Sequence, residues 1–105
     1  MTQYFIAYLG GEQPSSPEAG AQHMKQYRAW LASLGNAAVS PANPLKATKT
    51  VNSDGSVSNR STTSMSGFTI INAESMKAAL AIAEACPFLD VGGSLEVSEL
   101  IEMPG

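Results

Sequence analysis

The chain has 105 residues, of which 44% are hydrophobic and 14% are charged, so it has enough apolar material for a folded core and too little charge for a disordered chain. We interpret residues 1–105 as one small domain. A formal net charge of −3 leaves no general positive field to attract nucleic acid, which is therefore not an expected partner.

The longest nearly apolar stretch, residues 78–89, is far shorter than the roughly 20 residues that a membrane-spanning helix needs, so no membrane association is expected. The N-terminus has neither the positive region nor the long apolar region of a signal peptide. The only cysteine, Cys86, has no second cysteine with which to form a disulfide within the chain. Together these features favour a cytoplasmic protein.

The first part of the chain predicts a strand, a helix and a second strand. Residues Gln3–Leu9 are rich in aromatic and branched side chains and end at a glycine pair, which is typical of a buried strand. Ser16 followed by Pro17 predicts a helix start, because serine caps free amide groups and proline suits the first helical turn. The helix should extend to about Leu34, and residues 37–41 should form a short second strand.

The centre of the chain predicts a hairpin. Residues 45–52 alternate in the manner of a strand, residues 53–56 contain an Asp-Gly turn, and a partner strand should begin near Val57. The polar stretch 58–66 is short, so we interpret it as a loop inside the domain rather than as a linker.

The last part predicts a strand, a helix and a final strand. Residues 67–71 have strand composition, and Asn72 should cap a helix over residues 73–85, which Pro87 ends. A final strand is expected over residues 94–103, where apolar and acidic side chains alternate.

This element order, β-α-β-β-α-β with an extended central hairpin, is that of a ferredoxin-like α+β fold. Two helices on one face of an antiparallel sheet leave the other face open, and the chain has no spare element to cover it. A second copy of the chain would cover it, so the sequence predicts a homodimer.

Several segments resemble the YCII-related family, in particular its YciI-like branch. They are Gln22–Met24, Leu34–Gly35, Val39–Leu45, Ser66–Ile71, Ala78–Leu80, Cys86–Phe88 and Gly92–Val97. The resemblance spans essentially the whole chain and implies a dimeric α+β barrel, in which two sheets pack face to face, with a cleft beside the first helix. It also implies a catalytic pair formed by a helix histidine and an aspartate before a proline. His23 matches the histidine, whereas Cys86 precedes Pro87 where the aspartate is expected.

His23 is the only histidine, the residue type that titrates near neutral pH. One interpretation makes it a general acid or base in the cleft. The other makes it a helix-surface residue packed beside Tyr27 and Trp30, or a dimer contact. The residues alone leave both interpretations open.

Cys86 could act as a nucleophile, but it lies at the expected C-terminus of a helix, where the helix dipole disfavours a thiolate. The alternative is that it serves as a small buried apolar residue. Asp90 could supply the missing carboxylate, or it could lie in a solvent-facing loop.

We expect a pocket between the first helix and the sheet, near the dimer seam. Its expected lining is His23, Tyr27 and Trp30 from the helix, Ser40 from the second strand, and Cys86 or Phe88 from the end of the second helix. The sequence contains no metal-ligand cluster and no phosphate-binding glycine motif, so we expect neither a metal nor an organic cofactor.

Two functions fit this pocket. The first is a small enzyme that uses His23 as an acid or base on a small organic substrate. The second is a non-catalytic ligand-binding or regulatory dimer that holds a small molecule in the same cleft. The missing carboxylate favours the second function, and a histidine in the cleft favours the first.

Overall fold

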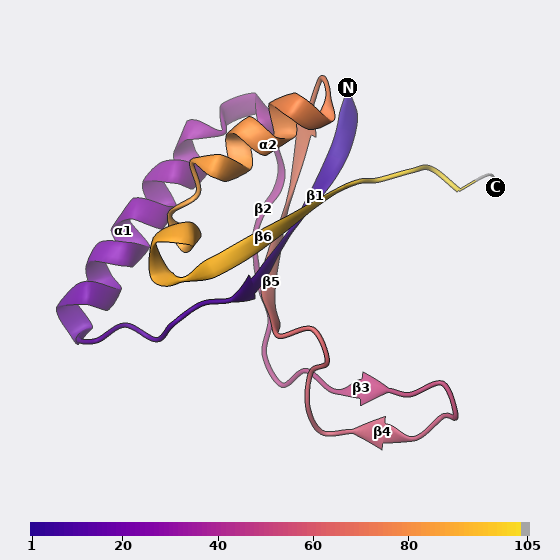
Figure 1. Ribbon diagram of the computed structural model, residues 1–105. Coiled ribbons are helices and arrows are strands. Elements are labelled where there is room, and N and C mark those ends of the chain that lie inside the picture. The colour runs from indigo at the N-terminus through magenta and orange to yellow at the C-terminus, as the bar shows by residue number, and fades with distance from the viewer. Residues whose placement is uncertain (104–105) are drawn as a thin grey trace.

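The structure is a computed structural model that describes residues 1–103, so the last two residues of the expected domain lie outside the described range. Its strands and helices are β1 (Thr2–Gly10), α1 (Pro17–Ser33), β2 (Ala38–Pro44), β3 (Thr50–Val51), β4 (Val57–Ser58), β5 (Met65–Ala73), α2 (Met76–Glu84) and β6 (Gly93–Glu99). Four of the strands form an antiparallel sheet in the order β2-β5-β1-β6. Figure 1 shows both helices on the same side of this sheet. The predicted ferredoxin-like α+β fold is therefore confirmed.

The core lies between the sheet and the two helices. Alternate residues of β1 point toward the helices, because side chains along a strand alternate between its two faces. These strand residues pack against both helices. The central members of the cluster are Tyr4, Ile6, Tyr8, Ile71, Trp30, Leu34, Ala79 and Ala83.

Helix α1 begins and ends where the sequence predicts. The Ser16 hydroxyl accepts a hydrogen bond from the amide of Ala19 at 3.1 Å, and Pro17 occupies the first turn. After the helix, Gly35 has a φ of 52°, a left-handed conformation that suits glycine and turns the chain toward β2. At both ends of this helix, the residues next to the boundary were therefore sufficient to predict where the helix begins and ends.

The predicted start of α2 is wrong. Ser75, not Asn72, is the N-cap, and its hydroxyl accepts a hydrogen bond from the amide of Ala78 at 3.1 Å. Asn72 and Ala73 instead extend β5, because they pair with the first residues of β1. Sheet pairing therefore overrides a good local capping signal. The helix itself ends at Glu84, just before Pro87, as predicted.

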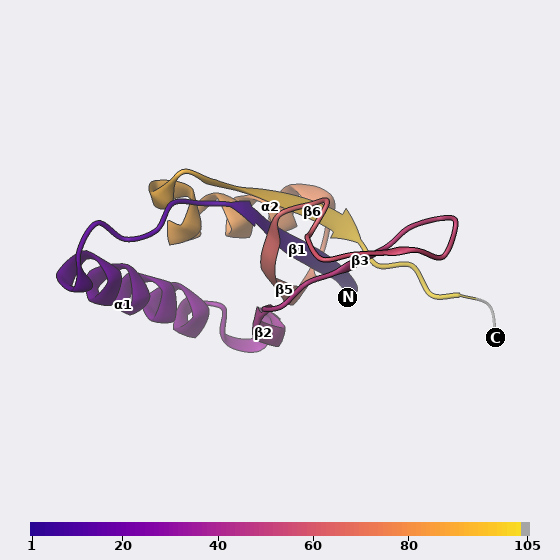
Figure 2. The ribbon, with the colours of Figure 1, turned by 90° about the horizontal axis from the view of Figure 1, so that it is seen from below.

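The predicted strand over residues 45–52 is reduced to Thr50–Val51, and β2 extends instead to Pro44. Prolines in β2 donate no backbone hydrogen bond, and its pairing with β5 is irregular, as expected of an edge strand. The β3–β4 hairpin pairs only with itself and projects away from the sheet, at the end opposite the start of α1 (Figure 2).

The final strand is shorter than predicted, since β6 ends at Glu99 rather than Met103. Glu99 pairs with Tyr4, and the amide of Leu100 donates to the carbonyl of Gln3 at 2.9 Å. Among the described residues after Leu100, none pairs with β1, so β6 does not continue through the rest of the alternating sequence.

The sheet face opposite the helices carries Phe5, Phe68 and Ile70, all of them only half-buried. The Phe5 and Phe68 rings stack with centroids 5.0 Å apart. The chain thus presents an apolar sheet face that its own helices do not cover.

Candidate functional site

A cavity of about 340 Å³ lies between α1 and the sheet. Phe88, in the short 3-10 helix over Pro87–Val91, closes one side, and Met24 and Leu31 line the α1 wall. Tyr8, His23 and Tyr27 also line the cavity, whose surface is largely apolar. Such an apolar cavity with a few polar groups is typical of a small-molecule site.

The space exists because of a glycine in β5. Gly67 pairs with Tyr8 across the sheet and lines the cavity without a side chain of its own. A Cβ at position 67 would lie 2.9 Å from the backbone oxygen of Asn43, so β2 also packs closely against this glycine. Gly67 therefore both keeps the cavity open and permits the approach of β2.

Of the residues that the sequence predicts for the pocket, the structure brings His23, Tyr27 and Phe88 to this cavity. The structure does not bring Trp30, Ser40 or Cys86 to it. Tyr8, Arg28 and Ser66 line the cavity without having been predicted. For Tyr8 there was a partial signal, since it shares a strand face with Tyr4 and Ile6.

Trp30 lies between the two helices rather than in the cavity. Its side chain is 5% exposed, and its indole N–H donates to the backbone oxygen of Ile82 in α2 at 3.1 Å. Helical periodicity placed Trp30 on the inner face of α1 correctly, but this face also contacts α2. The indole therefore joins the helices.

Ser40 is engaged within β2. Its hydroxyl interacts with the side-chain amide of Asn43, which also donates to the Ser40 carbonyl at 3.0 Å. The irregular pairing of β2 turns this part of the edge strand into a local side-chain turn. Ser40 thus stabilises the β2 backbone.

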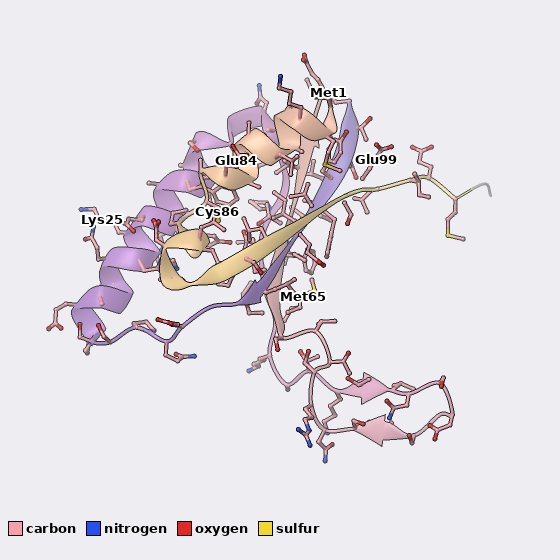
Figure 3. All side chains as sticks on the ribbon, in the orientation of Figure 1. Met1, Lys25, Met65, Glu84, Cys86 and Glu99 are labelled. Atoms are coloured by element: carbon pink, nitrogen blue, oxygen red, sulfur yellow. The ribbon has the colours of Figure 1, made fainter. Side chains whose placement is uncertain are left out.

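Cys86 belongs to the core, where its side chain is 2% exposed (Figure 3). Burial raises the pKa of its thiol, because a thiolate would lose its hydration there. A buried, protonated thiol is a poor nucleophile. Of the two interpretations of Cys86, the structure supports the buried apolar residue.

His23 lies where the cavity meets a second hollow of about 390 Å³, which is also lined by Glu12 and Asp90. Its Nδ1 atom is buried and has no hydrogen-bond partner among residues 1–103. Neither carboxylate is hydrogen-bonded to the imidazole in the described part of the chain. An unpartnered buried nitrogen costs about 1–3 kcal/mol, so His23 is poised to gain from a ligand or water molecule that supplies the missing bond.

Three hydroxyl groups, two from cavity-lining tyrosines and one from buried Thr69, are joined by hydrogen bonds. The Tyr27 and Tyr8 oxygens lie 2.9 Å apart, Tyr8 is also bonded to Thr69, and Thr69 donates to the carbonyl of Pro41 at 2.6 Å. Burial raises the pKa of Tyr8 above its ordinary value, so this phenol keeps its proton. Its ring also stacks on Phe88 with centroids 5.3 Å apart.

Within residues 1–103, no three His, Cys, Asp or Glu side chains are grouped so that they could hold a metal ion. In the same range, no helix has the length and apolar character required to cross a bilayer.

The fold and the cavity define a small ferredoxin-like protein with a histidine at the edge of a largely apolar pocket. The family model for the YCII-related domain matches residues 4–104, and the chain belongs to that family. The resemblance seen in the sequence is thereby confirmed.

Among solved structures, the chain is similar to 5-chloro-2-hydroxyhydroquinone dehydrochlorinase (TftG) from Burkholderia phenoliruptrix AC1100, in complex with 2,5-dihydroxybenzoquinone. The two share 20% sequence identity, with 95% of each chain covered and a TM-score of 0.58. This level of similarity shows a shared fold. No curated protein matches the chain.

Proposed function

We propose that this protein binds a small, largely apolar organic molecule in the cavity and that His23 transfers a proton to or from it, without a metal or organic cofactor. The observation that carries the proposal is the buried, unpartnered Nδ1 of His23, a residue that lines the cavity. A neutral imidazole nitrogen accepts a proton from a ligand near neutral pH, and a protonated one returns it.

The size and lining of the cavity support a ligand of one substituted ring. A volume of about 340 Å³ falls at the lower end of the range for small-molecule sites. Tyr27 and Phe88 contribute aromatic rings to the lining, and His23 contributes a polar residue type. The related fold of TftG holds 2,5-dihydroxybenzoquinone, a ligand of this size and character.

A second candidate function is a non-catalytic ligand-binding or regulatory module. It is favoured by the fact that neither Glu12 nor Asp90 is hydrogen-bonded to His23, although both line the adjoining hollow. A general acid or base is usually oriented by such a partner, whereas simple binding does not need one.

For the assembly, we propose a homodimer that buries the open sheet face. Support comes from the half-buried Phe5, Phe68 and Ile70, which form an apolar patch on that face. A stable dimer would have to cover roughly 800 Å² on each protomer, and a second sheet face has the complementary flat shape. A cytoplasmic location stays a prediction from the sequence.

The experiment that tests the site is a thermal-shift and NMR titration with a set of small phenols and quinones. Binding raises the melting temperature, and the stabilisation grows with the logarithm of one plus the ratio of ligand concentration to dissociation constant. We expect chemical-shift changes at His23, Tyr27 and Phe88 for a ligand that binds. Perturbations confined to other regions of the chain would refute the cavity as the binding site.

Turnover of a bound ligand separates the two functions. In the enzyme, His23→Gln abolishes turnover while binding persists. In the module, no bound ligand is converted by the wild-type chain. Lys25→Gln is the matched control, because Lys25 is exposed on the outer side of α1 (Figure 3) and should change neither quantity.

A further inference from the structure

The hydrogen bonds that join the hydroxyl groups of Tyr27, Tyr8 and Thr69 have a donor-to-acceptor direction, and this direction is set at the Thr69 end. The Pro41 carbonyl is an acceptor only, so Thr69 must donate its single hydroxyl proton there, at 2.6 Å. Thr69 is fully buried and does not line the cavity. Its proton is therefore unavailable to Tyr8.

The donor of each remaining hydrogen bond follows from the bond between Thr69 and Pro41. Because Thr69 has no second proton, the hydrogen bond between Tyr8 and Thr69 must be donated by Tyr8. Tyr8 likewise has only one proton, so the bond of 2.9 Å between the two phenols must be donated by Tyr27. The protons thus run from Tyr27 through Tyr8 and Thr69 to the Pro41 carbonyl, and we call these four groups the hydroxyl chain.

For the cavity, the consequence falls on Tyr27, the donor end of the hydroxyl chain and one of the residues that line the cavity. Its proton is already used, so its oxygen can only accept a hydrogen bond. Donation along the hydroxyl chain also increases the electron density on that oxygen and makes it a better acceptor. For Tyr27 to donate to a ligand, it would first have to break its bond to Tyr8, and one bond would merely replace another.

We propose that Tyr27 is a specificity-determining residue, which selects ligands that place a hydroxyl or amino hydrogen against its oxygen and disfavours ligands that offer only an acceptor there. This inference rests on the proposed function, since it requires the ligand to occupy the cavity. It adds a substrate class, namely small rings that carry hydrogen-bond donors. The Pro41 carbonyl causes this selection indirectly, because it takes the Thr69 proton and so sets the direction of the bonds from Tyr27 onward.

The test changes the direction of the hydroxyl chain without touching the cavity wall. Thr69→Val keeps the shape of the side chain but removes the acceptor of the Tyr8 proton. Tyr8 can then donate to Tyr27, and Tyr27 becomes free to donate into the cavity. Thr69→Ser is the matched control, because it retains the hydroxyl and hence the direction.

The probes are 1,3-dihydroxybenzene, which has two donors, and 1,3-dimethoxybenzene, which has only acceptors. Dissociation constants for both are measured by NMR titration of each variant, and the ratio of the two constants is compared between variants. Comparing ratios cancels the difference in probe size. We expect the wild-type chain and Thr69→Ser to prefer the dihydroxy probe, and Thr69→Val to lose about tenfold of that preference, the order of magnitude of one hydrogen bond.

Tyr8→Phe provides a second route to the same result if Thr69→Val does not fold. It removes the acceptor of the Tyr27 proton while keeping the ring that stacks on Phe88, and we expect the same loss of preference. If both probes bind and the ratio is unchanged in a folded Thr69→Val or Tyr8→Phe variant, the selection by Tyr27 is overturned while the binding site stands. If neither probe binds the wild-type chain, the proposed function is refuted and the inference falls with it.

Discussion

The indole N–H of Trp30 donates to the backbone oxygen of Ile82, and this bond of 3.1 Å joins α1 to the last turn of α2. Carbonyl groups in the last turn of a helix lack regular helical partners. The Ile82 carbonyl accepts a bond of 3.3 Å from the amide of Ala85, and the indole adds a second, shorter one. Trp30 is thereby a structural residue of the helix layer, adjacent in sequence to cavity residues but facing a different neighbour.

Trp30→Phe should lower the free energy of unfolding by about 2–3 kcal/mol, because it removes the indole hydrogen bond and leaves part of the indole volume empty. Ligand affinity should change less than twofold, since Trp30 does not line the cavity. Urea denaturation and ligand titration of the same variant measure the two effects. A large loss of affinity with little loss of stability would contradict the assignment of Trp30 to the helix layer.

His23→Leu should increase the free energy of unfolding by about 1 kcal/mol while abolishing any turnover. The reason is that leucine removes a buried nitrogen that has no partner in the described chain and fills similar space with apolar atoms. Urea denaturation in the absence of ligand measures the stability. His23→Gln is the comparison, because its buried amide retains the need for a partner and should give no such gain.

Cys86 should react very slowly with a thiol reagent in the folded chain. Burial raises the pKa of the thiol, so the reactive thiolate is scarce near neutral pH. The same shift predicts that stability is fully present below the ordinary thiol pKa and falls as the pH rises through the higher pKa of the folded state. Urea denaturation between pH 7 and about pH 10 should show this decrease, and Cys86→Ala should reduce it. An equal decrease in both chains would assign it to other groups.

Gly67→Ala should lower the free energy of unfolding by about 1–3 kcal/mol, because a Cβ at this position would lie 2.9 Å from the backbone oxygen of Asn43. Movement of β2 to relieve this clash would also alter the cavity, so ligand affinity should fall. Gly55→Ala is a control for loss of glycine alone, since nothing lies within 4 Å of a Cβ there, although its φ of 90° adds strain. Thermal denaturation and titration would show whether only Gly67→Ala affects binding.

Phe68→Asp should convert the proposed homodimer into a monomer. The substitution places a charge on the apolar sheet face, where it would have to be desolvated in the interface. Light scattering at micromolar concentrations measures the molar mass of each chain. Val51→Ser is the matched control, because Val51 is 72% exposed on the projecting hairpin and lies away from that face. A wild-type monomer would remove the proposed dimer altogether.

Helical periodicity alone predicted part of the site. His23 and Tyr27 lie one turn apart on α1, and both do face the cavity. The same periodicity grouped Trp30 with them, although Trp30 contacts α2. A repeat of 3.6 residues defines which side of a helix is buried, but it does not say which neighbouring element covers each turn.

Residues from the sheet were harder to predict. Tyr8 and Gly67 lie far apart in the sequence and meet only because β1 pairs with β5 in one particular register. The strand pattern shows that Tyr8 faces the core, but not that the position opposite lacks a side chain. The cavity arises from that pairing, and a local pattern carries no information about it.

The sequence by itself determined the order of the elements, the boundaries of α1 and the identity of the family, because caps, turns and alternating apolar residues act over a few neighbouring positions. The tertiary structure decided where α2 begins, where β6 ends, that Cys86 is buried, and that the protons of Tyr27, Tyr8 and Thr69 run toward Pro41. These outcomes depend on which distant backbone and side-chain groups become partners. That choice is made only when the sheet pairs and the helices pack against it.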